Sequence, residues 1–483
     1  MKPNILYLSI DSLRQDKCLG ESKTSFTPNL DKLIQSGTFF NQIISTAQIT
    51  VPSLSSIFTG LYPFECTTID NIRGRKGNLF NLNQNLPTFF DDVKKSGYHT
   101  YAIIPEVLKY TNVSKLFTNV EFFDSFVTLY DENLGNKILE TLNEDVKSPW
   151  FLFVHLVDLH GNASFHLENN FEKSGENYTG ENQYDKMLSA IDPWLGKIFQ
   201  CINLENTICV IASDHGSKFA DFTNEMVSFS LESDRLNEFE PGQGFNSAHK
   251  IATNLPKGFT PLRKKLAKIY TKTRKVKVKK KQELKAKELA ENLNLSPYQK
   301  RLLEKTHIIN SSECFDEGLR STLILLGPNI PSGKIISEQI STVDLFPTIL
   351  DLMETQTKIN HRGESLVPLF SNTKNDERIV MIEGTGDDGT QEKHSNTIGL
   401  RTKQYKYFRD RFSDNRNVHL YDLNNDPFEL SNISEQNPGI IENLEKKFSQ
   451  INPTGNFEFK KTQEVSEEEN KKLEDELRKL GYI

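Results

Sequence analysis

Short apolar runs alternate with amphipathic stretches along the first half of the chain. Apolar runs of strand length predict buried strands, and stretches with apolar residues every three to four positions predict helices between them. The predicted strands are Ile5–Ile10, His99–Ile104, Trp150–Val157, Thr207–Ala212 and Thr322–Leu326, and the predicted helices are Pro28–Ser36, Leu86–Ser96, Glu132–Leu142 and Tyr184–Phe199. This alternation predicts an α/β fold in which helices sandwich a mainly parallel sheet.

The alternation breaks between residues 218 and 306, which predicts a helical, basic insertion within a catalytic domain spanning residues 1–375. Beyond that domain, closely spaced short strands predict a smaller C-terminal antiparallel sheet and a terminal helix in residues 376–483. Within the insertion, Arg263–Lys287 holds thirteen Lys and Arg residues and one Glu. Such a run is either a solvated face or a contact surface for an anionic polymer or lipid.

Composition excludes several classes of protein. The net charge of −7 argues against a generally basic nucleic-acid binder, so we expect no specific nucleic-acid partner. Five cysteines without a CxxC pair argue against a zinc ribbon and a disulfide framework. Residues 1–3 run directly into the first predicted strand, and no later apolar run has the length of a membrane-spanning helix. We therefore expect a cytoplasmic protein without a transmembrane segment.

Polar residues follow several predicted strands. Asp11 comes after the first strand, His160 follows the Trp150 strand, and Asp214-His215 follows the Thr207 strand. In a parallel sheet these carboxyl ends meet at the edge where ligands bind. Thr50 lies just ahead of a predicted helix that starts near Pro52, and a helix N-terminus favours an anion.

Together these residues offer two carboxylates, one hydroxyl and one imidazole. Hard divalent cations accept this mixture, so Asp11, Thr50, Asp214 and His215 are the candidate ligands of one metal ion. Ca²⁺, Mn²⁺, Mg²⁺ and Zn²⁺ all remain open. Each residue taken alone is a weak signal, since Asp, Thr and Gly are common in caps and turns.

A set of motifs distributed over most of the chain resembles the sulfatase family of the alkaline phosphatase superfamily. The motifs are Asn4–Asp11, Thr27–Leu33, Thr50–Leu54, Thr59–Pro63, His155–His160, Ser213–Gly216, Phe315–Arg320, Val343–Thr348, Gly363–Leu366, Leu420–Pro427 and Leu480–Ile483. The resemblance implies one bound divalent metal ion and attack on a sulfate or phosphate ester.

Three departures from the family pattern bear on the chemistry. Sulfatases carry Cys or Ser where this chain has Thr50, and they convert that residue to formylglycine; oxidising Thr would give a ketone. The family's Arg in the same signature is Leu54 here, and its second early Asp is Ser12. A metal site with fewer carboxylates resembles that of the Thr-dependent phosphotransferases and phosphodiesterases of the superfamily. The favoured expectation is a metal-dependent hydrolase or transferase that cleaves phosphate diesters or monoesters through a Thr50 nucleophile, without formylglycine.

The resemblance also suggests substrate-binding residues and leaves alternatives open. His160 would bind the ester oxygens or protonate the leaving group, whereas His155 lies inside a strand, where a satisfied core histidine is expected. His307 is the candidate for a second substrate ligand, with His249 and Lys250 competing for that role. The first alternative is a sulfuric ester hydrolase without formylglycine, which uses Thr50 directly or an activated water. The second is a non-catalytic, sulfatase-like binding module.

Overall fold

A nine-stranded sheet is the centre of one of the two units into which the chain divides, residues 1–218 and 310–483. The computed structural model describes residues 2–71, 78–124, 127–129, 132–160, 179–217, 295–306, 314–371, 377–385, 396–452, 455 and 457–461. The other unit is Phe219–Ile309, and its described residues include one helix, α12 (Pro297–Thr306). The other helices and strands named below belong to the first unit.

The strand order of the central sheet is β10-β2-β9-β8-β1-β7-β5-β6, and β11 also pairs with β2. Only β9 runs antiparallel to its neighbours, and the other pairs in this sheet are parallel, which confirms the mainly parallel fold. The strands are β1 (Asn4–Ile10), β2 (Thr38–Ile44), β5 (His99–Pro105), β6 (Asn119–Phe123), β7 (Trp150–Leu156), β8 (Thr207–Ala212), β9 (Arg320–Leu326), β10 (Lys334–Ile336) and β11 (Ile340–Ser341).

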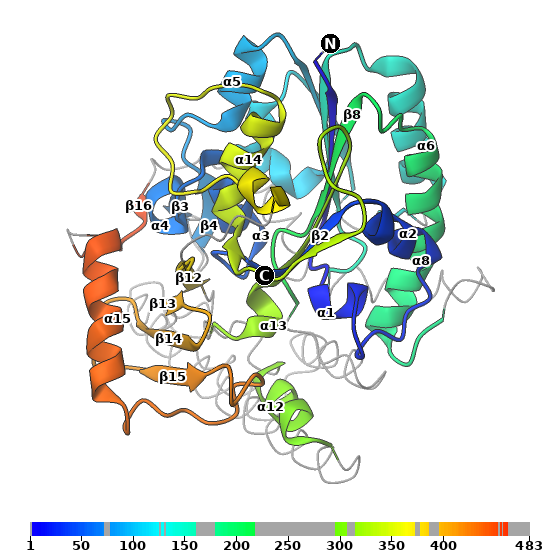
Figure 1. Cartoon of the computed structure of the whole chain (residues 1–483). Helices are drawn as coiled ribbons and strands as arrows, with labels where there is room; N and C mark the ends of the chain where they lie inside the picture. The colour runs from blue at the N-terminus through cyan, green and yellow to red at the C-terminus, as the bar shows by residue number, and fades with distance from the viewer. Residues whose placement is uncertain are drawn as a thin grey trace, which may run out of the picture. The chain divides into compact units, whose positions relative to one another are not determined.

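The three middle strands β1, β7 and β8 are entirely buried, because helices cover both faces of the sheet. In Figure 1, α5 and α14 lie on one side of the sheet, and α2, α6 and α8 lie on the other. The longer helices are α2 (Pro28–Ser36), α3 (Thr50–Thr59), α5 (Phe89–Lys95), α6 (Glu132–Glu140), α8 (Gln183–Gln200) and α14 (Leu345–Leu352); the short ones are α1 (Gln15–Cys18), α4 (Pro63–Cys66) and α13 (Asp316–Leu319).

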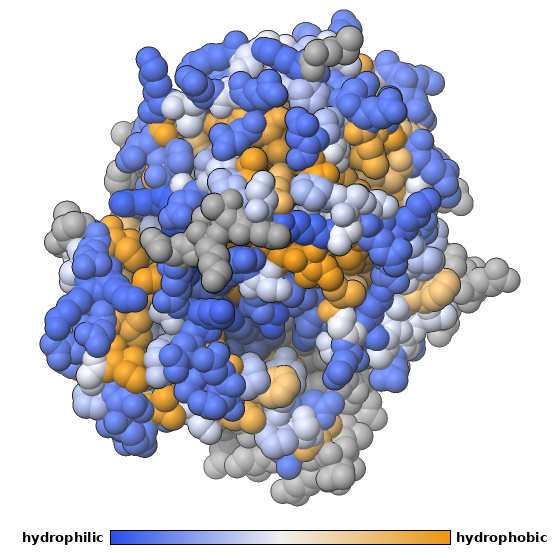
Figure 2. All heavy atoms as spheres, viewed as in Figure 1, coloured by the Kyte–Doolittle hydropathy of each residue, from blue (hydrophilic) through white to orange (hydrophobic). Residues whose placement is uncertain are grey.

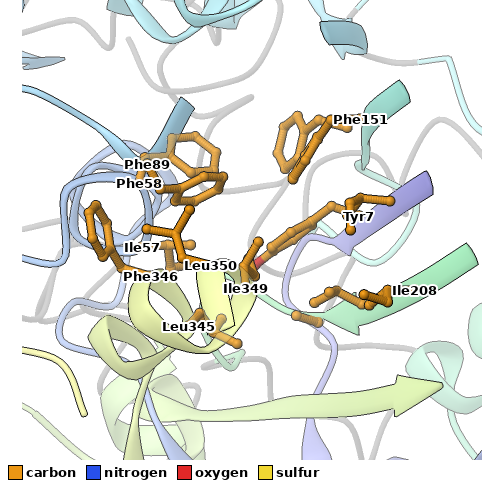
Figure 3. Close-up of a cluster of buried hydrophobic side chains, with 14 of the residues drawn as sticks. Tyr7, Ile57, Phe58, Phe89, Phe151, Ile208, Leu345, Phe346, Ile349 and Leu350 are labelled. Atoms are coloured by element: carbon orange, nitrogen blue, oxygen red, sulfur yellow. The ribbon is translucent and has the colours of Figure 1, made fainter. Parts of the chain in front are cut away.

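Each face of the sheet has its own apolar core. On the face covered by α3, α5 and α14, an aromatic cluster centres on Phe58, whose ring lies 5.8 Å from that of Phe89 and 5.4 Å from that of Phe153. Figure 3 shows this core. Phe58, Phe89 and Phe346 lie together there, and Tyr7 extends into the same core from β1. The second core packs α2, α6 and α8 against the other face. Continuous burial of this kind fixes the strand ends, and therefore the residues that follow them.

A separate antiparallel sheet, β12-β13-β14-β15, confirms the predicted C-terminal architecture. Its strands are Val380–Thr385, Asn396–Arg401, Tyr405–Asp410 and His419–Asp422. The helix α15 (Pro438–Ile451) was not predicted from the sequence. Its side chains Leu444 and Phe448 pack into the apolar core of this antiparallel sheet. The terminal helix that was predicted lies outside the described residues. A third, small sheet joins β3 (Thr67–Asn71), β4 (Asn78–Leu82) and β16 (Lys460–Lys461).

Hydrophilic residues dominate the face drawn in Figure 2, and hydrophobic residues emerge there in separate patches. Among the described residues, the most exposed large hydrophobic side chains are those of Phe26, Ile335 and Phe428. In the described part of the chain, no helix is both long enough and apolar enough to cross a membrane.

Candidate metal centre and active site

Three candidate metal ligands meet at the carboxyl edge of the central sheet. Asp11 directly follows β1, and Asp214 and His215 lie just beyond β8. Because β1 and β8 are adjacent and parallel, both strands end at the same edge. One ligand atom from each of the three side chains lies within 4.8 Å of the others, and all three residues are buried. This is the geometry expected of side chains that share one cation.

Thr50 lies at the same place, but as the first residue of a helix. The helix α3 begins at Thr50 after Ile49 as N-cap, which is earlier than the predicted start near Pro52. The Thr50 Oγ1 atom lies 3.1 Å from Asp11 Oδ2 and 3.5 Å from His215 Nε2. Free amide groups and the helix dipole add positive potential there. The hydroxyl thus lies between a carboxylate, an imidazole and an anion-attracting helix end.

The orientation of His215 is set by its own backbone. Its Nδ1 lies 2.6 Å from the carbonyl oxygen of Gly216, so this nitrogen carries the hydrogen and the Nε2 lone pair faces Asp11 and Asp214. A neutral imidazole with a free lone pair is the form that binds metals. Gly216 is required because a Cβ there would lie 2.2 Å from the carbonyl oxygen of Glu317. The Asp-His-Gly sequence is therefore a tightly packed ligand-bearing turn.

The turn that carries Asp11 is strained and is fixed by a distant tyrosine. Ser12 has a φ of 63°, a conformation that side-chain-bearing residues rarely adopt. The Tyr184 hydroxyl donates to the Ser12 carbonyl at 2.8 Å and accepts from the Arg14 N–H at 2.8 Å. Sequence reasoning missed Tyr184, and nothing in its local pattern separates it from an ordinary core residue of α8. Strain stabilised from outside is common at functional sites.

Two serines connect Asp214 to the start of α3. The Ser45 hydroxyl donates to the backbone oxygen of Asp214 at 2.7 Å and lies 3.2 Å from the hydroxyl of Ser53. Ser53 in turn donates to the carbonyl oxygen of Ala47 at 3.1 Å. These contacts hold the segment ahead of Thr50 against the end of β8. They had no recognisable signal in the sequence beyond a local abundance of Ser.

The pKa values of Asp11 and Asp214 are shifted in opposite directions. Burial opposes ionisation of Asp11, but the hydrogen bond from His155 and the charge of His160 outweigh it and hold the Asp11 pKa below its ordinary value. Burial and the neighbouring Asp11 charge raise the pKa of Asp214. Asp214 is completely buried, and its Oδ2 has no hydrogen-bond partner among the described residues. An orphaned carboxylate oxygen beside a second carboxylate and an imidazole lone pair fits a divalent cation.

The remaining predicted residues divide into two groups. His160 is half-buried just beyond β7, and its effect on the Asp11 pKa places it near the cluster. His155 is buried within β7, as expected, but it also reaches Asp11, with Nε2 3.5 Å from Oδ2. His307, the competing candidates His249 and Lys250, and the basic run 263–287 all lie outside the described residues.

With this geometry in place, comparisons with known proteins become informative. The family model for sulfatases matches residues 3–355, which is most of the chain. The chain belongs to the sulfatase family. A second family model, described as the C-terminal part of N-sulphoglucosamine sulphohydrolase, matches residues 310–453. The family assignment from the motifs is thus confirmed, whereas the Thr-nucleophile branch within the family is not.

Curated relatives of this chain carry a consistent name. Arylsulfatase K of Homo sapiens is 30% identical over 182 residues, covering 32% of this chain and 33% of the human protein. Arylsulfatase K of Xenopus laevis is 33% identical over 134 residues, covering 27% of this chain and 25% of that protein. The matched part therefore spans at most a third of these relatives.

Solved structures agree on the fold over nearly the whole length. A phosphonate monoester hydrolase of Agrobacterium radiobacter aligns with a TM-score of 0.59 and 16% identity, covering 94% of this chain and 96% of that chain. A 2-O GAG sulfatase aligns with a TM-score of 0.57 and 14% identity, covering 94% and 93%. At this identity the likeness is one of fold. The family to which this chain belongs consists of hydrolases acting on sulfuric or phosphoric esters.

These comparisons correct the favoured expectation from the sequence. The prediction of a phosphate ester hydrolase that uses Thr50 as nucleophile is wrong, because the relatives are arylsulfatases, and the first alternative, a sulfuric ester hydrolase, fits better. The error has a physical reason. Carboxylates, an imidazole and a helix N-terminus serve a sulfuryl and a phosphoryl group equally well, so one substituted residue was given too much weight.

Proposed function

We propose that this protein is a divalent-metal-dependent sulfuric ester hydrolase whose site is the carboxyl edge of the central sheet. The observation that carries the proposal is the convergence of Asp11, Asp214 and His215 beside the N-terminus of α3, with Asp214 Oδ2 lacking a hydrogen-bond partner among the described residues. The names of the curated relatives support sulfate over phosphate. The substrate class is an anionic ester.

Asp11, Asp214 and His215 would hold the cation, since each directs a donor atom to one place. A divalent cation there supplies positive charge that stabilises the oxygens of the sulfuryl group during transfer. The backbone amides of Thr50 and Val51, in the first turn of α3, can bind another of those oxygens. Ca²⁺, Mn²⁺, Mg²⁺ and Zn²⁺ all suit this donor set.

Thr50 is assigned to the positioning of a water molecule, without formylglycine. Its hydroxyl hydrogen is directed to Asp11 Oδ2 at 3.1 Å, which leaves the oxygen lone pairs to accept a hydrogen bond from water. A sulfate ester on Thr50 would lack the elimination route that an aldehyde hydrate offers, so direct attack by water is the simpler course. The water oxygen bonds to sulfur as the ester S–O bond breaks, and the leaving alcohol oxygen takes up a proton, for which His160 is the candidate donor. One proton of the water then restores the protonated form of His160, and the other leaves with the product as hydrogensulfate.

Turnover of nitrophenyl sulfate by matched variants tests this assignment. Thr50→Ala removes the water-orienting oxygen and should lower kcat by roughly 10²- to 10⁴-fold, the range for loss of a positioning or proton-transfer group. Thr50→Ser keeps the hydroxyl and should retain much of the rate. Thr59→Ala at the other end of α3 is the control, because the Thr59 hydroxyl donates to the Ser55 carbonyl and accepts from the Leu61 N–H, both away from the metal ligands. Equal rates for Thr50→Ala and Thr59→Ala would remove Thr50 from the mechanism.

A further inference from the structure

His155 is a polar residue inside the central, fully buried strand β7. It is 1% exposed, and its register partner on β1 is Ser9, two residues before Asp11. Because side chains alternate along a strand, Ser9 and Asp11 project to the same face of the sheet. His155 therefore lies beside the strand end that carries a candidate metal ligand.

Three contacts define the position of the His155 ring. Its Nδ1 lies 2.9 Å from Ser9 Oγ, and its Nε2 lies 3.5 Å from Asp11 Oδ2. Its plane is nearly parallel to the ring of Phe153, at an interplanar angle of 17° and a centroid distance of 6.2 Å. With one nitrogen bonded and one face packed, the ring has little freedom to turn Nε2 away from Asp11.

The same contacts determine the tautomer. If the Ser9 hydroxyl donates to Nδ1, then Nε2 carries the hydrogen and donates toward the carboxylate of Asp11. The opposite tautomer would direct the Nε2 lone pair at Asp11 Oδ2 in a buried place. That arrangement suits His215, whose lone pair would bind the cation, but it is unfavourable for His155, which is not one of the three candidate ligands. The chain Ser9–His155–Asp11 thus runs in one direction, from hydroxyl to imidazole to carboxylate.

We propose that His155 is a positioning residue that orients Asp11 for cation binding. Asp11 then receives hydrogen bonds on both oxygens, because Ser12 Oγ donates to Oδ1 at 2.7 Å and Thr50 Oγ1 donates to Oδ2 at 3.1 Å. His155 completes this set from a neighbouring strand and holds the carboxylate plane against rotation. Groups behind a metal ligand commonly determine its orientation and basicity. The inference rests on the metal site of the proposed function.

Calorimetric titration of the metal-free full chain with Ca²⁺, Mg²⁺ and Mn²⁺ tests the inference without measuring turnover. His155→Phe keeps a ring against Phe153 but has no donor, so the cation should bind about 10- to 100-fold more weakly. His155→Gln restores a donor and should bind the cation more tightly than His155→Phe. The matched control is His419→Phe, since His419 also packs flat against a phenylalanine, Phe408, at 4.6 Å and bonds a hydroxyl, that of Tyr421. Its affinity should equal that of the wild type.

The outcomes separate the inference from the proposed function. Wild-type affinity in His155→Phe would overturn the role of His155 while leaving the metal site intact. Failure of the wild type to bind any of the three cations would overturn the metal site and the inference together. If His155→Phe does not fold, Ser9→Ala provides the second test, since it removes the hydroxyl that fixes the tautomer. Affinity unchanged in Ser9→Ala would then count against the proposal.

Discussion

Two buried charge clusters of this protein differ in how their charge is balanced. The C-terminal ion cluster consists of Asp316, Arg401, Lys406 and Glu429, two acids and two bases. Lys406 Nζ lies 2.5 Å from Asp316 and 2.7 Å from Glu429, and Arg401 pairs with Asp316 at 2.8 Å. Its charges neutralise one another within the protein.

The cluster at the sheet edge is balanced differently. Among the described residues, Asp11 and Asp214 have imidazole, hydroxyl and amide contacts but no ion pair with Lys or Arg. Two carboxylates share a buried place, and Asp214 Oδ2 has no partner in the described part of the chain. In the C-terminal ion cluster the opposite charges are part of the protein, so the buried charges contribute to its stability. At the sheet edge the carboxylates have no such counter-charge among the described residues, so their burial favours the binding of a cation.

The largest expected effect comes from neutralising the incomplete cluster. Asp214→Asn keeps an oxygen for the amides of Ser12 and His215 but removes the charge that attracts a cation. Turnover of nitrophenyl sulfate should fall by about 10³-fold or more, as for the loss of a principal catalytic group. The thermal midpoint of the metal-free protein should not fall, since repulsion from Asp11 is relieved. Retained turnover, or a large loss of stability in the metal-free variant, would show that Asp214 stabilises the fold and does not serve cation binding, which would contradict the contrast between the two clusters.

The second effect concerns the complete cluster. Lys406→Met leaves two buried carboxylates without their shared ammonium, and the free energy of unfolding should fall by about 3–5 kcal/mol. Urea denaturation at pH 8 measures it. The control is Lys446→Met, which breaks an exposed pair with Glu442 and should leave the free energy of unfolding close to that of the wild type. Equal losses in both variants would show that the buried cluster does not depend on its internal balance.

The smallest effect is a pH dependence of stability. Burial raises the pKa of Glu429 to about 7, and the charge of Lys406 only partly offsets it. Between pH 5 and 7 the folded protein therefore holds a proton that the unfolded chain has lost, so stability falls as pH rises. The Glu429→Gln variant cannot lose this proton. Its free energy of unfolding should therefore fall by about 1–3 kcal/mol less than that of the wild type between pH 5 and 7. Urea melts at successive pH values measure it, and parallel curves would contradict the assignment.

Most of the fold and the centre of the site were predictable from sequence. The strands β1, β7 and β8 have continuous apolar runs, and their ends carry Asp11, Asp214 and His215 at predictable places. The strand β2 was missed because Asn41 and Gln42 interrupt its apolar pattern where the strand is half-buried. A strand that is buried on both faces is easy to recognise from its continuous apolar run. A strand that is partly exposed, such as β2, has a mixed pattern and is easily missed.

The supporting contacts of the site could not be predicted. Tyr184 lies 172 residues from Ser12, and His155 lies 146 residues from Ser9, so only the folded sheet brings these groups together. The substrate was not predictable either, because the residues at the sheet edge bind tetrahedral oxyanions by charge and shape that sulfate and phosphate share.

The most direct test of the account is hydrolysis of nitrophenyl sulfate and nitrophenyl phosphate by the same protein. Metal-free wild type would be reloaded with Ca²⁺, Mn²⁺, Mg²⁺ or Zn²⁺, and kcat/KM compared for both esters, with Asp214→Asn as the control for contaminating activity. The account predicts metal-dependent release of nitrophenol with the sulfate ester preferred. Preference for the phosphate ester, or sulfate hydrolysis that is unaffected by metal removal and by Asp214→Asn, would contradict it.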